Sequence, residues 1–174
     1  MLQSKFNLAP FRKSFGEWPE TALGDSVNLI LQSVQLMSLS AGTGAPNVCP
    51  VYFALYDETS LCFVSNVNSR HTKLFGKTDA ASVAIYNSSQ PWASPRVGIQ
   101  MTGNCKQTSI AESLKARERY AERFPANTKD TTVSEVVARA MEGLRFFLFT
   151  PTEIKILDEP RFGEEKYIVL VREQ

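Results

Sequence analysis

The first segment with a regular hydrophobic pattern has helical spacing. Val27, Ile30, Leu31 and Val34 fall at i, i+3, i+4 and i+7, which places them on one face of a helix. Asp25 stands just before them and has the side chain of a typical N-cap. The pattern therefore predicts a helix over residues 25–33.

The middle of the chain and its tail are rich in β-branched and aromatic residues instead. Clusters of Gly, Asn, Ser and Pro separate these segments, as expected between strands. We expect two long strands in the tail, broken near Pro151 and Pro160. The earlier strands are predicted over residues 34–41, 48–56, 61–65, 81–86 and 97–108.

Two further helices are predicted between these groups of strands. Residues 112–124 are largely charged with a few hydrophobic positions, and residues 133–144 keep a 3.6-residue hydrophobic spacing. Pro125 separates them. Short strands at regular intervals with few helices favour a barrel or a sandwich, mainly β with helices (α+β).

A single domain over residues 25–174 accommodates all these elements. Residues 1–24 scatter Pro, Gly and aromatic residues without a period, which predicts an irregular N-terminal arm. Phe11, Phe15 and Trp18 are the residues expected to anchor it.

The composition excludes several classes of function. The 174 residues include 19 Lys and Arg against 18 Asp and Glu, a net charge of +1, so no nucleic acid partner is expected. One histidine and three widely spaced cysteines exclude a multi-histidine metal site and a zinc ribbon, so we expect no metal. The odd cysteine count is typical of a reducing compartment, and no apolar run approaches the roughly 20 residues of a membrane span. We expect a soluble cytoplasmic protein with no membrane partner.

Motifs of common catalytic mechanisms are absent. A Ser or Cys nucleophile needs a neighbouring base, and His71 is the only imidazole. The sequence contains neither a GxxxxGK phosphate loop nor a GxGxxG. Gly42 and Gly44, which precede Pro46, are interpreted as hairpin residues. No catalytic residue is assigned.

One segment has specific chemical content, residues 63–74. It ends a predicted strand, forms a short polar loop and starts a helix. Ser69 is placed to cap that helix, and Arg70 is placed to meet an anion with forked hydrogen bonds. The alternative interpretation is an ordinary N-cap followed by a solvated face of Arg70, His71 and Lys73.

The order of these elements resembles the pyridoxamine 5'-phosphate oxidase-like family of FMN-binding split barrels. The likeness lies in SVQLMSLSAGTGAPNVCPVYFALYDETSLCFVSNVNSRHTKLF, AIYNSSQPW and RVGIQMTGNC, and covers roughly residues 25–110. The remainder is similar to an uncharacterised branch of the family. The resemblance implies an antiparallel split β-barrel of six to seven strands. It also implies a C2 homodimer with FMN in clefts at the interface between the protomers.

Cofactor contacts follow from the resemblance residue by residue. Ser69 and Arg70 correspond to the FMN phosphate site, and His71 stands where a lysine is usual. Ser65 would lie beside the phosphate and ribityl chain, Val64 before it is also expected to contact the cofactor, and Gln100 would reach the flavin from the inward face of its strand. The backbone at the isoalloxazine edge corresponds to Pro50, Val51, Tyr52 and Phe53.

Alternatives remain open for several of these contacts. The side chains of Val51 and Phe53 are equally well interpreted as barrel core. Trp92, in the loop after a strand, would cover a flavin face or a partner surface, or would simply pack against its own chain.

Three positions depart from the family pattern. Ala54 replaces a phosphate-binding lysine, Cys49 replaces an arginine, and Gly98 replaces a glutamine that contacts the flavin. Tyr120 and Arg123 are spaced differently from the oxidase residues that hold the substrate phosphate. These departures argue against vitamin B6 oxidation and weaken the expected grip on FMN.

The sequence therefore favours an FMN-binding oxidoreductase that acts on a small molecule of unknown identity. A non-catalytic flavin or ligand-binding dimer is the alternative. A heme-binding barrel, with His71 as the single available imidazole ligand, is a third possibility.

Overall fold

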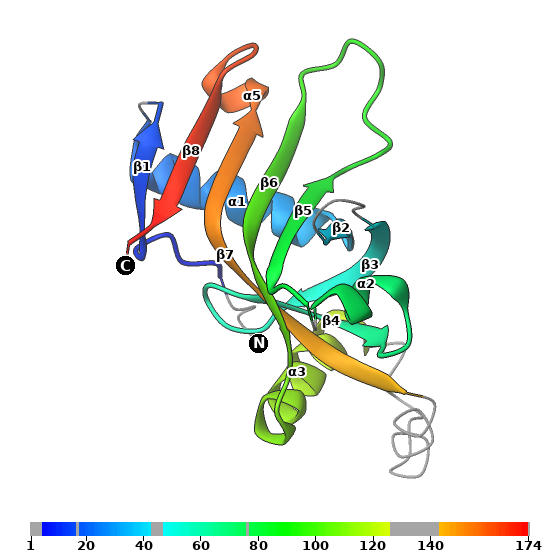
Figure 1. Ribbon diagram of the computed structural model, residues 1–174. Helices are drawn as coiled ribbons and strands as arrows, with labels where there is room; N and C mark the ends of the chain where they lie inside the picture. Colours follow the sequence, from blue (N-terminus) through cyan, green and yellow to red (C-terminus); the bar gives the residue numbers. More distant parts are fainter. Residues whose placement is uncertain (1–4, 17, 43–46, 76, 126–142, 174) are drawn as a thin grey trace.

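The computed structural model describes residues 5–16, 18–42, 47–75, 77–125 and 143–173. Nearly all of the helix predicted over residues 133–144 lies outside these residues. Within them, eight strands form one antiparallel sheet (Figure 1). The strands are β1 (Phe11–Phe15), β2 (Leu36–Ala41), β3 (Asn47–Leu55), β4 (Leu61–Asn66), β5 (Ala80–Tyr86), β6 (Val97–Gln107), β7 (Leu144–Asp158) and β8 (Tyr167–Arg172).

Six of the strands close into a barrel. Their order is β7-β4-β3-β2-β5-β6, and β6 pairs again with β7 to complete the circle. The other two strands, β8 and β1, extend the sheet beyond β7. The predicted antiparallel split barrel of the α+β class is therefore confirmed.

β7 connects the barrel to this extension. Its first part, Leu144–Phe149, pairs with β4, and its last part, Glu153–Leu157, pairs with β8. Pro151 lies between the two parts, where β7 has no described partner on that edge, and such a position tolerates a residue without an N–H. The predicted break at Pro151 is therefore wrong. The chain does leave the sheet at Pro160, in the short helix α5 (Glu159–Phe162).

Gly103 explains how β6 stays paired with β7 at this point. The register of the two strands shifts between Thr102 and Gly103. The backbone of Thr150 and Pro151 comes so close that it leaves no space for a Cβ at Gly103. A residue without a side chain is therefore required there.

Three other helices surround the sheet. α1 (Glu20–Ser33) packs its buried residues against β5 and β6, and α3 (Ile110–Arg123) lies outside the barrel against β3, β4 and β7. α2 (Arg70–Phe75) packs against β2 and β3, and Phe75 contacts Phe63 and Phe147 in the interior. α2 therefore closes one end of the barrel.

The N-terminal region differs from its prediction. Residues 11–15 form β1 on the edge of β8, and α1 already begins at Glu20, after Pro19. The irregular arm and the N-cap at Asp25 are therefore wrong, and Asp25 is an exposed residue within the helix. The longer helix includes the buried Leu23, which extends the predicted hydrophobic face by one turn.

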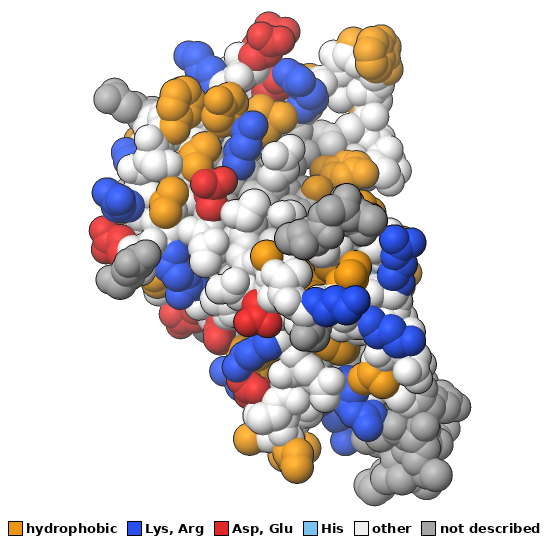
Figure 2. Space-filling view, in the orientation of Figure 1, with side chains coloured by type: hydrophobic (Ala, Val, Ile, Leu, Met, Phe, Trp, Pro, Cys, Tyr) orange, Lys and Arg blue, Asp and Glu red, His pale blue; other side chains and the backbone are white. Residues whose placement is uncertain are grey.

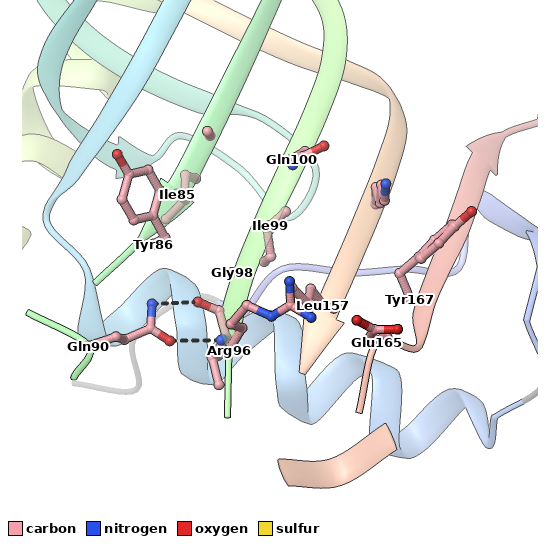
Figure 3. A pocket seen from close by; sticks show the side chains of 13 residues that line it. Ile85, Tyr86, Gln90, Arg96, Gly98, Ile99, Gln100, Leu157, Glu165 and Tyr167 are labelled. Atoms are coloured by element: carbon pink, nitrogen blue, oxygen red, sulfur yellow. Dashed lines mark hydrogen bonds between the residues drawn. The ribbon is translucent and has the colours of Figure 1, made fainter. Parts of the chain in front are cut away.

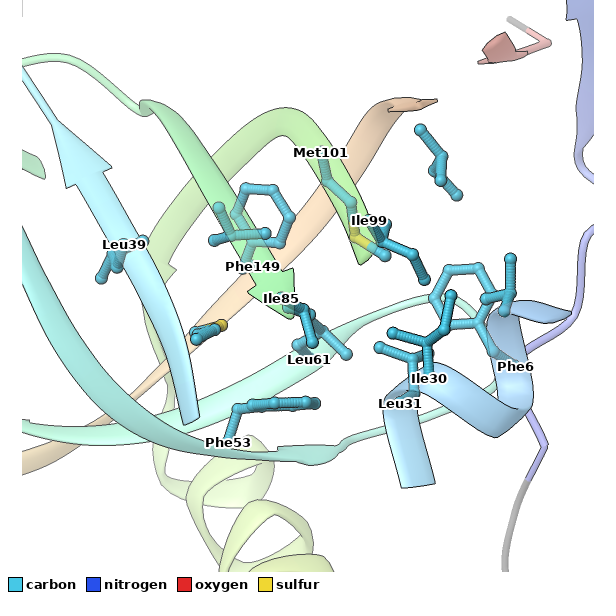
Figure 4. Packing of buried hydrophobic residues seen from close by; sticks show 14 of the residues in the cluster. Phe6, Ile30, Leu31, Leu39, Phe53, Leu61, Ile85, Ile99, Met101 and Phe149 are labelled. Atoms are coloured by element: carbon cyan, nitrogen blue, oxygen red, sulfur yellow. The ribbon is translucent and has the colours of Figure 1, made fainter. Parts of the chain in front are cut away.

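The barrel interior is filled by side chains. The largest fully buried residues include Phe53, Phe63, Phe149 and Met101, each less than 2% exposed. Figure 4 shows Ile30 and Leu31 of α1 on one side of this core and Leu39 of β2 on the other. A cofactor would therefore bind outside the barrel.

Candidate functional site

β3 and β4 separate part-way along their length. They pair only through Phe53–Leu55 and Leu61–Phe63. Beyond Phe63, β4 continues alongside β7, while the earlier part of β3 continues alongside β2. No described strand pairs with the edges left open, at Pro50–Tyr52 of β3 and Val64–Asn66 of β4. We call this opening the β3–β4 split.

The open edge of β3 presents backbone hydrogen-bonding groups. The N–H of Phe53 donates to the carbonyl of Gln35, on the β2 side, at 3.2 Å. Successive residues of a strand direct their backbone groups to opposite edges. The N–H and C=O of Tyr52 and the C=O of Pro50 therefore point toward the split, where a heterocycle with donors and acceptors would find partners.

A cluster of hydroxyl groups around His71 joins the end of β4 to α2. The Oγ of Ser65 lies 2.7 Å from the Nε2 of His71, and the Oγ of Ser69 lies 3.2 Å from the same nitrogen. The Oγ of Ser69 also lies 2.9 Å from the Oγ1 of Thr72, which donates to the carbonyl of Asn66. We call these four side chains the Ser65 cluster. Burial lowers the pKa of His71, so its imidazole is neutral near pH 7.

Arg70 differs from the Ser65 cluster because it is exposed. It is the first residue of α2 and directly follows Ser69, which is partly buried. Ser69 occupies the predicted cap position, yet its hydroxyl contacts the side chains of His71 and Thr72. An anion at this corner would meet Arg70 and Ser69 before it reached the buried Ser65 or His71.

The predicted residues of β3 point to both faces. Phe53 is fully buried and Val51 packs against the core, whereas Pro50 and Tyr52 are exposed. Ala54, at the position of the missing lysine, is buried against Ala116 of α3. No long cationic side chain would fit there without displacing the helix.

The outer face of the neighbouring strands carries no charge. Each of β3, β2, β5 and β6 has three outward residues in its central part, and adjacent ones are cross-strand partners. They are Val48, Pro50, Tyr52, Leu36, Ser38, Ser40, Ser82, Ala84, Tyr86, Gly98, Gln100 and Thr102. We call this surface the uncharged face. It lies beside the β3–β4 split because Pro50 and Tyr52 belong to both.

Gln100 belongs to this outer surface. It is exposed, whereas its neighbours Ile99 and Met101 are buried in the barrel. The prediction that Gln100 faces inward is therefore wrong, because side chains alternate along the strand and the apolar neighbours take the interior.

A hollow of about 550 Å³ adjoins Gln100 on the outer face of β5, β6, β7 and β8. Figure 3 shows Tyr86 on one side, Tyr167 on the other, and Gly98, Ile99 and Leu157 between them. We call it the tyrosine hollow. Figure 2 shows hydrophobic side chains gathered over the neighbouring β7 and β8, interspersed with charged ones.

The loop between β5 and β6 is fixed at its base and carries Trp92. The Gln90 side chain accepts from the N–H of Val97 at 2.8 Å and donates to its carbonyl at 3.1 Å. Arg96 forms an ion pair with the buried Glu159 at 2.6 Å. Hydrogen bonds from the side chain and the backbone N–H of Arg96 lower the pKa of Glu159 to about 2. Trp92 itself is 99% exposed, so it does not pack against its own chain.

The structure brings most predicted cofactor residues to one place and leaves two apart. Those of β3, β4 and α2 surround the β3–β4 split, while Gln100 and Trp92 lie toward the tyrosine hollow and its loop. Sequence reasoning missed Lys155 and Tyr167, which line the hollow. Nothing local in the sequence identifies them, because they become neighbours of Gly98 only through the pairing of β6, β7 and β8.

The described residues meet neither the requirements of a metal site nor those of a membrane-spanning helix. The described residues contain no group of three or more His, Cys, Asp or Glu side chains placed to hold a metal ion. None of the described helices combines the length and the hydropathy that crossing a bilayer requires.

No protein-family model and no curated protein matches the sequence. Solved structures do match its fold. A conserved hypothetical protein, Rv2991 from Mycobacterium tuberculosis, superposes with a TM-score of 0.64 at 14% identity, over 94% of this chain and 95% of that chain.

Two further matches have a described role. A putative pyridoxamine 5'-phosphate oxidase from Listeria innocua gives a TM-score of 0.58 at 17% identity, over 78% of this chain and 98% of that chain. HutZ, the heme storage protein from Vibrio cholerae, gives 0.57 at 12% identity, over 85% of this chain and 93% of that chain. The chain therefore has the split-barrel fold found in pyridoxamine phosphate oxidase-like and heme-binding proteins.

Proposed function

We propose that this split-barrel protein is an FMN-binding oxidoreductase that acts as a homodimer. The observation that carries the proposal is the exposed Arg70 at the start of α2, the helix that follows the open edge of β4 and packs against β3. Arg70 and Ser69 would hold the phosphate, and the backbone of Pro50 and Tyr52 would meet the polar edge of the ring.

The donor set fits a singly phosphorylated flavin. A guanidinium forms paired hydrogen bonds with a phosphate, and a strand edge offers a donor and acceptors to a flat heterocycle. The expected affinity for FMN is lower than in the family pattern, because Ala54 contributes no cation. Each missing charged hydrogen bond costs about 1.5–3 kcal/mol, so we expect a Kd in the micromolar range.

A second copy would complete the site. The uncharged face is contiguous with the split and includes the exposed hydrophobic residues Leu36, Val48 and Tyr52. Interface centres are depleted in charged residues and rich in aromatic ones, which this face matches. In a C2 dimer the same face meets itself, so Gln100 and Trp92 of each copy would approach the split of the other.

FMN, when bound, would supply the redox chemistry by accepting and passing on a hydride or electrons. The chain's own residues would bind and orient the cofactor. Tyr52, together with Trp92 of the second copy, would exclude water from the ring, because both side chains are large and exposed.

Of the two alternatives, heme binding has the less support. Heme ligation by His71 would require its Nε2 to leave Ser65, at 2.7 Å, and to emerge from a buried position. A non-catalytic flavin-binding dimer would use the same site. It differs from the oxidoreductase only in lacking turnover.

Flavin titration tests the binding part of this function. Purified protein is stripped of small molecules, titrated with FMN and followed by flavin fluorescence and by melting temperature. We expect saturable quenching and a melting temperature that rises with FMN concentration. If about 1 mM FMN produced neither the quenching nor the rise in melting temperature, the proposal would be contradicted. Turnover of bound FMN with NADH or NADPH, followed at 340 nm, separates an oxidoreductase from a flavin carrier.

A further inference from the structure

The tyrosine hollow has the shape of a slot for a flat molecule. Tyr86, Gly98, Leu157 and Tyr167 are successive cross-strand neighbours on β5, β6, β7 and β8. Strands lie about 4.8 Å apart, so the outer two members of this row are roughly 14 Å apart. Because Gly98 has no side chain, the floor of the hollow is open next to Tyr86, and the Leu157 side chain forms its apolar part next to Tyr167 (Figure 3).

The hollow also contains a cation available for binding. Lys155 is half-buried, and its Nζ lies 4.1 Å from the centre of the Tyr167 ring. It forms no ion pair with any carboxylate in the part of the chain that the structure describes. Arg96, at the far side of the hollow, is already paired with Glu159.

Gln100 supplies a neutral hydrogen-bonding group beside this cation. It is the cross-strand partner of Lys155, and its exposed amide is hydrogen-bonded to none of the described residues. An ammonium and an amide on adjacent strands provide complementary donors for the two oxygens of one carboxylate.

We propose that the tyrosine hollow binds a planar aromatic carboxylate. The aromatic part lies over Gly98 between Tyr86 and Tyr167, and the carboxylate is held by Lys155 and Gln100. A volume of about 550 Å³ accommodates two fused rings and their substituent. Glu165, an acidic residue that lines the hollow, would repel the ligand's carboxylate. The carboxylate is therefore expected on the Lys155 side.

This site does not require bound flavin. If FMN also binds as proposed, a ligand here is a candidate substrate or electron acceptor, because Gln100 lies on the uncharged face that would meet the flavin of the other copy. If FMN does not bind, the hollow remains a binding site in its own right.

The test uses calorimetric titration of flavin-free protein with two probes of equal size. 2-Naphthoate carries a carboxylate, and 2-naphthalenemethanol is its neutral counterpart. We expect saturable naphthoate binding, about fivefold tighter than that of the alcohol, since a partly exposed ion pair contributes modestly. Lys155→Met should abolish the preference. Lys77→Met, which removes an exposed cation that forms no ion pair with the described residues, should retain it.

Tyr86→Ala and Tyr167→Ala test the walls of the slot. Each ring is exposed, so the fold should survive, which melting temperatures would verify. We expect each variant to weaken naphthoate several-fold, because Tyr86→Ala removes a ring that contacts the ligand and Tyr167→Ala removes the ring that positions the Lys155 ammonium. Naphthoate that fails to bind, or that binds Lys155→Met as tightly as the parent, overturns the proposal. FMN affinity, measured separately in Lys155→Met, should be unchanged, so failure of this site is distinguishable from failure of the flavin site.

Discussion

The Oγ of Ser65 lies 2.7 Å from the Nε2 of His71, and this contact links the penultimate residue of β4 to the first turn of α2. The pair is buried together with Thr72. The corner that carries Arg70 is therefore held by neutral side chains underneath it, while the guanidinium itself is exposed.

Burial of His71 predicts a loss of stability in weak acid. The pKa of His71 is lowered in the folded state, so below about pH 6.5 the unfolded chain takes up a proton that the folded chain does not. Stability from this group is present above pH 6.5 and is lost as the pH falls. Urea unfolding at pH 7 and pH 5.5 measures the effect. His71→Gln should show a smaller decrease over that interval, and an equal decrease would contradict the assignment.

Two glycines predict opposite effects of the same substitution. A Cβ at Gly24, in α1, meets nothing within 4 Å, so Gly24→Ala should raise the free energy of unfolding by about 0.5–1 kcal/mol. A Cβ at Gly103 would collide with the backbone of β7, so Gly103→Ala should lower it by about 1–3 kcal/mol. Denaturant unfolding of the two variants compares them directly. A Gly103→Ala variant as stable as the parent would show that β6 and β7 are not this close.

Burial predicts the order in which the three cysteines react with a thiol reagent. Desolvation raises the pKa of Cys62 to about 12 and raises that of Cys105 as well, and both side chains are fully buried. Cys49 is only partly buried, although its pKa is also raised. With Ellman's reagent at pH 8, Cys49 should react first and slowly, and the other two only on unfolding. Fast reaction of two or more thiols in the native protein would contradict the packing.

The proposed dimer predicts that one charge on the uncharged face separates the copies. Ser38 lies in the middle of that face, between Pro50 and Ala84. Ser38→Glu should shift the protein toward monomer in sedimentation velocity, because two like charges would face each other across a C2 interface. Gln32→Glu, which adds the same charge to an exposed position of α1, should leave the oligomeric state unchanged. A monomeric parent protein would contradict the dimer itself.

Local pattern predicted the strands and the corner at Ser69 and Arg70 well. Each of these elements is short and bounded by turn residues, so neighbouring residues determine where it begins and ends. The alternation along residues 98–101 would also have predicted the outward orientation of Gln100, because the apolar Ile99 and Met101 belong in the barrel interior.

Relationships between distant segments were not predictable in this way. The pairing of β1 with β8, and the passage of β7 through Pro151, depend on which strand is available as a neighbour. The tyrosine hollow likewise exists only because Gly98 on β6 is aligned with Leu157 on β7 and, through it, with Tyr167 on β8. Sequence pattern gives the face of each residue but not the register between strands.

The affinity of Arg70→Ala for FMN tests the central claim most directly. Lys73, an exposed cation on the same short helix, supplies the matched control Lys73→Ala. Arg70→Ala should weaken FMN about 10- to 100-fold, the loss expected for a charged hydrogen bond of about 1.5–3 kcal/mol, and should leave riboflavin, which lacks the phosphate, unaffected. Lys73→Ala should bind FMN nearly as the parent does. FMN affinity that is equal in the parent and in Arg70→Ala would contradict the phosphate site at α2 and the account built on it.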